Sequence, residues 1–322
     1  MKTYEETESI QQLHDVYEKM KAEIGKMIIG QHETIEKVIT CIFSQGHCLL
    51  IGVPGLAKTL LVNTVAKVLG LSFNRIQFTP DLMPSDIIGT EILDENRRFR
   101  FMKGPVFAHV ILADEINRTP PKTQSALLEA MQEKSVTVAG TTYSLDNPFF
   151  VLATQNPIEQ EGTYPLPEAQ LDRFMFNIWL DYPSLKEEIN IVEATTGAGL
   201  QQPSQLLDAQ QILYYQDLIR QLPVTPIIYE YAVKLARSTR PGPGASLFTS
   251  KYITWGAGPR ASQYLILGAK CHAALDGRYA PDVDDVRAVA TSVLRHRIVR
   301  NYKAEAEGIS VDDIIRHLME TR

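Results

Sequence analysis

The chain has 322 residues, of which 44% are hydrophobic and 22% are charged, a composition typical of a soluble globular protein. Its length allows one large domain or two domains of ordinary size. A formal net charge of −6 disfavours a strongly nucleic-acid-binding surface, and no apolar run approaches the length of about 18 residues that a membrane helix needs.

The N-terminal part predicts two helices and no secretory signal. It begins MKTYEETES, which is polar and acidic, so we expect a cytoplasmic protein with reduced cysteines. Apolar residues spaced by three and four predict an amphipathic helix over residues 8–28 and a second one through Ile35 to Ile42. A break at Ile29-Gly30-Gln31 separates the two helices.

Short apolar runs of strand length follow, and helical patterns over residues such as 59–69 and 122–132 separate most of them. Because parallel neighbours in a sheet need a crossover, strands that alternate with helices predict an α/β fold with a parallel sheet. The five expected strands are His47–Ile51, Ser72–Phe78, His109–Ala113, Phe149–Thr154 and Phe174–Leu180.

Two stretches interrupt this alternation and predict inserted β-hairpins. Residues 91–102 alternate apolar and charged side chains around a turn at Asp94-Glu95-Asn96, and residues 135–145 do so around Gly140. After Asp181-Tyr182-Pro183 helical patterns dominate. We therefore expect an α/β domain over residues 1–183 and an all-α domain over 184–322, interrupted by a Pro/Gly-rich loop at 240–259.

The segment Gly52–Thr59, GVPGLAKT, lies between a predicted strand and a predicted helix, which is the context of a phosphate-binding loop. Loop N–H groups and the helix N-terminus favour phosphate oxygens, Lys58 can reach the β and γ phosphates, and Thr59 can offer its hydroxyl to Mg²⁺. Ala57 stands where the strict motif has glycine, which is tolerable if its φ is negative. An accidental glycine-rich turn is the alternative.

Polar residues also end two of the later strands. Asp114 and Glu115 follow a buried strand, so Asp114 is expected to bind Mg²⁺ and Glu115 to orient and deprotonate the attacking water. An isolated solvated pair is the alternative. Asn156 is expected to contact the γ-phosphate or the lytic water, with Gln155 as a structural cap the other possibility. Ligands of open α/β sheets bind at this carboxyl edge.

The motifs GVPGLAKT, LADEINR, ATQNP, YPLPEAQLDRF and GPRA resemble the MoxR family of AAA+ ATPases, over nearly the whole chain. The resemblance implies a P-loop AAA+ sheet with a helical lid, Mg²⁺ and ATP as ligands, and an alanine at position 57. It also implies that Ile29, Gly30 and Gln31 pack against adenine. The nucleotide-binding loop would comprise Gly52, Val53, Pro54, Gly55, Leu56, Ala57, Lys58, Thr59 and Leu60.

Two arginines gain roles from this resemblance alone. Arg173 matches an arginine finger that reaches the γ-phosphate of a neighbouring subunit, and an Asp172–Arg173 surface pair is the alternative. Arg260 matches the sensor arginine that opens a lid helix, in its own subunit or the neighbour's. Gly258 stands where the family pattern has serine, and the loop at 242–256 is long.

For function, the resemblance implies a hexameric, chaperone-like ring that remodels client proteins with a VWA-domain partner. The D-x-S-x-S signature of that domain does not occur in this sequence, so the partner would be another chain. Both hairpins match those of ring motors, where Arg98, Arg100 and Phe101 would contact a central pore unless their hairpin is simply solvated. A nucleic-acid motor, a small-molecule kinase and a nucleotide-gated scaffold are the alternatives.

The remaining basic residues predict no further site. His32, His47, His109 and His272 lack metal-ligand spacing, and Arg295-His296-Arg297 is expected to form a solvated face or a subunit contact.

Overall fold

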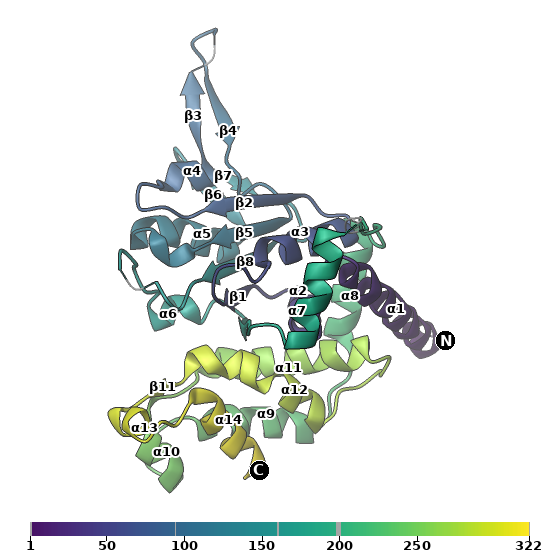
Figure 1. Cartoon of the computed structure of the whole chain (residues 1–322), viewed down its shortest axis with the longest axis vertical. Helices are drawn as coiled ribbons and strands as arrows, with labels where there is room; N and C mark the ends of the chain where they lie inside the picture. Colours follow the sequence, from purple (N-terminus) through teal and green to yellow (C-terminus); the bar gives the residue numbers. More distant parts are fainter. Residues whose placement is uncertain (1, 94, 160, 198–200, 322) are drawn as a thin grey trace.

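The computed structural model describes residues 2–93, 95–159, 161–197 and 201–321. A central sheet with its flanking helices forms one body, and a layer of helices from the C-terminal part lies against it (Figure 1). Among the residues described, no helix combines the length and the apolar character needed to cross a membrane.

The central sheet has five strands in the order β2-β5-β8-β1-β9, and every neighbouring pair is parallel. This confirms the predicted α/β class. β5 is buried throughout because both faces of the sheet are covered, which is why its sequence is a continuous apolar run. The strands are β1 (Cys48–Ile51), β2 (Phe73–Gln77), β5 (Val110–Asp114), β8 (Phe150–Gln155) and β9 (Phe176–Trp179).

Alternation along the strands feeds two separate hydrophobic cores. Leu50 and Leu112 face a core shared with the N-terminal helices and the C-terminal layer. Leu49 and Ile111 face a second core under α5. The first helix begins earlier than predicted, because residues before position 8 extend it without an apolar pattern. The helices of this body are α1 (Lys2–Gly25), α2 (His32–Phe43), α3 (Lys58–Val68), α4 (Pro84–Ile88), η1 (Ile116–Arg118), α5 (Pro121–Glu133) and α6 (Glu168–Leu171).

Both predicted hairpins form, as β3 (Gly89–Leu93) with β4 (Phe99–Lys103) and β6 (Ser135–Val138) with β7 (Thr141–Ser144). The β3–β4 hairpin projects furthest from the body (Figure 1). Asp94, in its predicted turn, lies outside the described residues. Phe101 stacks on Tyr143 with ring centroids 4.0 Å apart, so it joins the two hairpins, whereas Phe99 is exposed.

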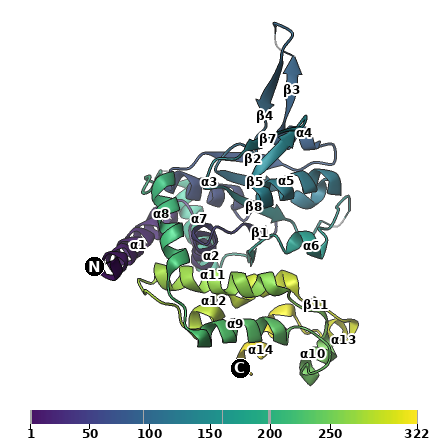
Figure 2. The same ribbon diagram turned by 180° about the vertical axis from the view of Figure 1, so that it is seen from behind.

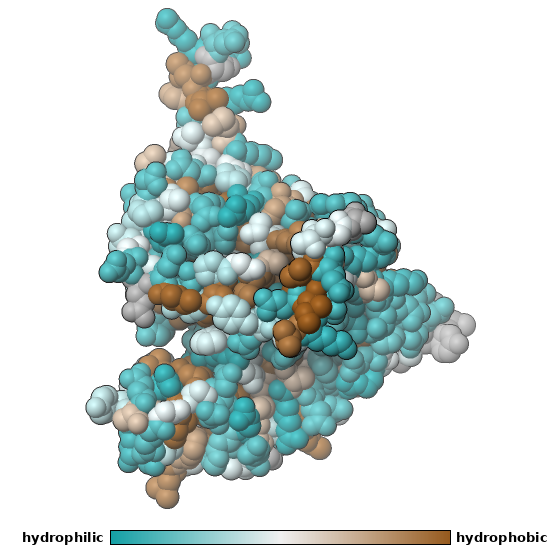
Figure 3. Space-filling view, viewed as in Figure 1, coloured by the Kyte–Doolittle hydropathy of each residue, from teal (hydrophilic) through white to brown (hydrophobic). Residues whose placement is uncertain are grey.

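Exposed apolar residues gather in several places on the face seen in Figure 3, and two of these places are prominent. One is the β3–β4 hairpin, with Leu93 and Phe99, and the other is α7 (Leu185–Thr196), with Leu185, Ile189 and Val192 spaced along one side. No residue of α7 is buried. The helix is thus a surface element that follows β9 and precedes the C-terminal helices.

The C-terminal part is mainly helical, as predicted. It also contains a short antiparallel pair, β10 (Ile253–Trp255) with β11 (Val299–Arg300). Gln216 donates to the carbonyl of Ile42, so α8 packs on α2 of the first body. The boundary at residue 183 stays a prediction. The remaining helices are α8 (Ala209–Gln221), α9 (Pro226–Ser238), α10 (Leu247–Tyr252), α11 (Pro259–Leu275), α12 (Val283–Leu294), η2 (Arg295–Arg297), α13 (Tyr302–Ala306) and α14 (Val311–Glu320).

The prediction of a solvated face for the basic run at η2 is wrong, and the other possibility, a subunit contact, stays a prediction. His296 and Arg297 both contact the carbonyl of Phe174, and Arg295 donates to the carbonyl of Asn177 in β9. Burial lowers the pKa of His296 and, together with the nearby Arg297 charge, favours its neutral form. The run therefore joins the C-terminal helices to the edge of the sheet.

Candidate nucleotide site

The glycine loop leaves β1 at Gly52 and enters α3 at Lys58. Gly52 donates its N–H to the carbonyl of Gln155, which brings the loop beside the end of β8. We expected alanine to be tolerated at position 57 through a negative φ, but Ala57 has a φ of +54°, so that expectation is wrong. The chain turns into the helix through a left-handed residue there, which costs alanine about 1–2 kcal/mol relative to glycine's unhindered backbone.

Lys58 bends back over the loop. Its ammonium donates to the carbonyls of Gly52 and Val53, at 3.3 Å from the latter. Burial lowers the pKa of Lys58, and the charges of Asp114 and Glu115 act in the opposite direction. The charges of both carboxylates therefore act on this lysine and partly offset the effect of its burial.

The other loop residues differ in how far they are exposed. Leu56 is buried, Pro54 and Gly55 are exposed, and the side chains of Val53 and Leu60 pack against the first core. Val53 and Leu60 can therefore offer only backbone groups to a ligand.

Asp114 is buried at the end of β5 and both of its oxygens are held by donors. Thr154 donates to Oδ1 at 2.6 Å, and Arg75 donates to Oδ2 from Nε at 3.0 Å and from Nη2 at 2.6 Å. Thr154 also accepts the N–H of Glu115 at 2.9 Å. One hydroxyl thus fixes the carboxylate of the first acidic residue and the backbone of the second.

Glu115 lies just beyond the strand with a φ of +58°, so the chain turns sharply after Asp114. Its Oε2 accepts from Gln77 at 2.9 Å and from Arg118 at 3.3 Å, while Arg118 also pairs with Glu159. The left-handed turn directs the two adjacent carboxylates into different surroundings, one buried among strands and one at the sheet edge.

Asn156 is buried and directly follows β8. Its Oδ1 accepts the N–H of Ile158 at 3.1 Å, which caps the loop after the strand. We considered Gln155 as a structural cap, but the capping bond is made by Asn156. Its amide nitrogen has no hydrogen bond among the described residues and can donate to a ligand.

The segment Ile29–Gln31 lies against the glycine loop. Gly30 and Gln31 have φ values of +72° and +54°, and Gln31 donates its amide to the carbonyl of Leu56 at 3.2 Å. A Cβ at Gly30 would lie 2.6 Å from Oε1 of Glu187, so α7 closes over this turn. The Oε1 of Gln31 is buried without a partner in the described part of the chain. A buried carbonyl in that state is ready to accept a donor.

The two arginines that the family resemblance singled out, Arg173 and Arg260, lie beside or in contact with Asp172. Arg260, at the start of α11, donates to Asp172 at 3.3 Å, and Arg297 donates to the same carboxylate at 2.7 Å. The predicted alternative for Arg173, a pair with Asp172, is not what the structure has. The guanidinium of Arg173 has no hydrogen-bond or ion-pair partner among the residues described.

Known protein families match two parts of the chain. A family model described as "ATPase family associated with various cellular activities (AAA)" matches residues 47–176, and an AAA lid model matches 246–318. Chaperone MoxR1 of Mycobacterium tuberculosis is 45% identical over 301 residues, covering 93% of this chain and 80% of that protein. Protein MoxR of Methylorubrum extorquens is 32% identical over 326 residues, covering 95% of this chain and 94% of that protein.

The fold agrees with a solved relative as well. The crystal structure of a candidate ATPase from Cytophaga hutchinsonii has a TM-score of 0.91 and 44% identity, covering 100% of this chain and 98% of that one. The chain belongs to the MoxR family of AAA+ ATPases. Membership supports a chaperone-like AAA+ ATPase in general, with nucleotide binding as its chemistry.

The sequence did not single out four side chains that hold the carboxylates of this MoxR-family site. Thr154 carried a visible pattern, a hydroxyl within an apolar strand one residue before its end. Arg75, Gln77 and Arg118 carried none, because charged and polar residues are common on half-exposed strands and turns. Only the sheet order, which sets β2 beside β5, shows why the first two reach the acidic pair.

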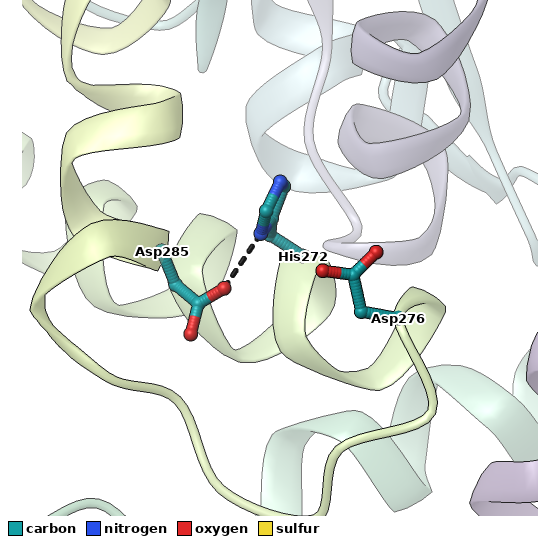
Figure 4. A group of neighbouring side chains, drawn as sticks. All are labelled: His272, Asp276 and Asp285. Atoms are coloured by element: carbon teal, nitrogen blue, oxygen red, sulfur yellow. Dashed lines mark hydrogen bonds and ion pairs between the residues drawn. The ribbon is translucent and has the colours of Figure 1, made fainter.

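A second cluster of titratable groups lies in the MoxR lid, where His272, Asp276 and Asp285 approach one another (Figure 4). The ring of His272 contacts Asp285 at 2.6 Å. Asp285 also accepts from Arg278 and from the N–H of Asp282. With its oxygens so engaged, the cluster is an ion-paired brace between α11 and α12.

The brace shifts the pKa of both partners. The hydrogen bond to Asp285 raises the pKa of His272 above its ordinary value. Burial would raise the pKa of Asp285, but hydrogen bonds from His272 and Arg278 hold it well below its usual range.

Proposed function

We propose that this chain binds Mg²⁺-ATP at Gly52–Thr59 and hydrolyses it to ADP and phosphate. The observation that carries the proposal is the sheet order: β8 pairs in parallel with both β1 and β5, so the glycine loop after β1 and the acidic pair at the end of β5 lie at the same carboxyl edge. A loop of this kind, a lysine and two strand-end carboxylates are the parts that P-loop phosphoryl transfer requires.

The donor set fits a magnesium ion. Thr59 has a hydroxyl without a hydrogen bond among the described residues, and Asp114 supplies hard carboxylate oxygens that Thr154 and Arg75 hold in a fixed orientation. Mg²⁺ held there would supply positive charge to offset that of the phosphates. Lys58 would release the loop carbonyls and donate to the β and γ phosphates instead.

Glu115 would orient the attacking water and accept its proton. Gln77 and Arg118 hold Oε2, and Oε1 has no hydrogen bond in the described part, so it is available to a water molecule. The Asn156 amide would donate to the γ-phosphate or to the same water. Proton transfer to a positioned carboxylate contributes about 10²–10⁴ in rate.

Adenine would pack against Ile29 and the turn at Gly30, with Gln31 closing the pocket. We assign to the unpaired Oε1 of Gln31 the role of accepting the exocyclic amine of adenine. Guanine presents a carbonyl at that position, which would leave two acceptors facing each other. An ATP preference over GTP follows from this pairing.

The assembly we propose is a hexameric ring in which Arg173 acts as a finger on the neighbour's γ-phosphate. Among the described residues its guanidinium has no hydrogen-bond or ion-pair partner, which supports a partner from a neighbouring chain. Arg260 is tied to Asp172 and would sense nucleotide from the lid. The ring would remodel client proteins together with a VWA-domain partner, as the chaperone name of one relative suggests.

Single substitutions test the catalytic role of Glu115 and the finger role of Arg173 separately. Glu115→Gln should retain ATP and lose about 10²-fold or more in turnover, because the carboxylate that accepts the proton is gone. Arg173→Ala should lose about 10³-fold in turnover with nearly unchanged ATP affinity. Fluorescent-nucleotide titration and phosphate release measure the two quantities, with Lys58→Ala as the binding-defective control.

Mixing the two variants should restore part of the activity, since a Glu115-bearing subunit can then meet an intact Arg173. Wild-type turnover equal to that of Glu115→Gln would overturn the catalytic assignment. Assembled mixed rings without any recovery would overturn the finger. Strong stimulation by single-stranded DNA at moderate salt would favour a nucleic-acid motor in place of a protein remodeller.

A further inference from the structure

A groove of about 810 Å³ lies in the lid, between α9, the loop of residues 240–246 and the end of α14. These elements lie together at the side of the lid away from the central sheet in both ribbon views (Figures 1 and 2). None of the residues predicted for the nucleotide site lines the groove. Its size is in the range of pockets that bind small molecules or short peptide segments.

One face of α9 forms the longest wall. Ile227, Tyr231, Lys234 and Ser238 are spaced by three and four along it and line the groove. The opposite face is buried in the lid core, so this face is the one left to a ligand. From Ile227 to Ser238 the wall rises by eleven helical steps, or about 16 Å, so it can accommodate about five residues of an extended peptide.

The groove carries an excess of positive charge in a chain whose net charge is −6. Lys234, Arg237 and Arg240 line it, and among the described residues of the lining the acidic one is Glu230, which pairs with Lys234 at 2.6 Å. Arg237 has no hydrogen-bond or ion-pair partner among the described residues. Arg240 donates from Nε to the carbonyl of Ala257. Its two Nη atoms have no hydrogen bond among the described residues and are available to a ligand.

The rest of the lining is apolar, aromatic or bare backbone. Phe248 stacks on His317 with ring centroids 3.8 Å apart, and Ile227 is largely exposed at the other end of α9. Gly242 and Gly244 have positive φ, and nothing lies near the position of a Cβ on either. The flanking prolines stiffen this loop, so it forms a preset wall that a ligand's backbone can approach closely.

We propose that this groove binds an acidic peptide segment, with at least one large apolar side chain, from a partner protein. Carboxylates of the segment would pair with Arg237 and Arg240, and an apolar side chain would lie either on Ile227 or on the Phe248–His317 stack. Bidentate carboxylate pairing is the recognition that guanidinium groups favour. A phosphate or a nucleic-acid backbone would leave the apolar lining at Ile227 and the Phe248–His317 stack unused.

The proposal assigns a role to the long Pro/Gly loop, which the nucleotide chemistry does not use. A random-peptide display library panned against the full chain should return sequences rich in Asp and Glu around a large apolar residue. The synthetic, fluorescein-labelled form of the most enriched peptide then serves as the probe in anisotropy titrations at physiological salt.

Matched charge reversals locate the binding. Arg237→Glu should weaken the peptide by about tenfold or more, because it removes an unpaired cation and adds repulsion. Arg316→Glu makes the same change in net charge at an exposed side chain of α14 that does not line the groove, and should alter affinity by less than about twofold. Ile227→Ser, at an exposed position, should weaken binding without changing the fold or the basal ATP turnover.

Three results would overturn the proposal. One is a library that yields no acidic consensus. Another is equal weakening by Arg237→Glu and Arg316→Glu, which would mean non-specific attraction to the surface. The third is displacement of the peptide by millimolar inorganic phosphate, which would make the groove a simple anion site.

Discussion

Asp172 holds two arginines of the C-terminal part, and its substitution is a direct test of how the lid is attached. Its Oδ1 accepts from Arg297 at 2.7 Å and its Oδ2 from Arg260 at 3.3 Å. Burial lowers the pKa of Arg297, and the charge of Asp172 counteracts that effect. Asp172→Asn preserves the shape of the side chain while it removes the counter-charge of a buried guanidinium.

The loss of stability in Asp172→Asn depends on the hydrogen bonds that Arg297 retains. Breaking a buried ion pair costs about 3–5 kcal/mol, but Asp172 is 31% exposed and Arg297 retains backbone carbonyl acceptors, so we expect about 2–3 kcal/mol. An unfolding entropy of about 2.1 cal/mol/K per residue gives about 0.7 kcal/mol/K for 322 residues. The melting temperature should therefore fall by about 3–4 °C.

Differential scanning calorimetry of the full chain measures this shift and also shows whether the lid melts separately. Asp284→Asn is the matched control, since Asp284 is exposed and pairs only with Arg287 among the described residues. The control should melt within about 1 °C of the parent. If Asp172→Asn melts with the control, the buried pair does not hold the lid and the reasoning is refuted.

Three other substitutions test separate parts of the chain. Thr154→Val removes the hydroxyl that donates to Asp114 and should lower turnover by about 10–100-fold with ATP affinity within about threefold, and unchanged turnover in a phosphate-release assay would contradict it. Ala57→Gly relieves a left-handed alanine at the cost of chain entropy, so urea unfolding should show a gain of up to about 1 kcal/mol, whereas a clear loss would count against the strain. The raised pKa of His272 adds stability that is complete below about pH 6.5 and is lost as the pH rises through the folded value. The depressed pKa of Asp285 keeps that carboxylate charged throughout, so the parent should lose more stability between pH 6 and pH 8 than His272→Gln, and equal pH slopes in urea titrations would refute the pairing.

The sheet and the main nucleotide motifs could be predicted because their sequence patterns are local. β5 and β8 are buried on both faces, so continuous apolar runs mark them, and the acidic pair follows directly at the strand end. The glycine loop lies between a strand and a helix within thirteen residues of sequence, Leu49–Leu61. Patterns of this kind do not depend on knowing which strands are neighbours.

What the sequence could not supply depends on contacts between distant segments. Arg75 reaches Asp114 only because β2 lies beside β5 in the sheet. Arg297 was expected at the surface because arginine is rarely buried, and it lies inside because Asp172 and several carbonyls, far from it in sequence, accept its donors. The left-handed backbone at Ala57 was missed since φ is set by the whole loop.

Asp172 and Arg173 are consecutive in sequence, but they act on different parts of the proposed ring. The first is clamped by the lid of its own chain, and the second, in its proposed role, points at the nucleotide of the next chain. A single peptide bond then links the two, with no flexible segment between them. If Arg173 moves when the γ-phosphate is lost, Asp172 moves with it and the Arg260 and Arg297 contacts are strained. Hydrolysis in one subunit of a ring would thus act on the lid of the next subunit.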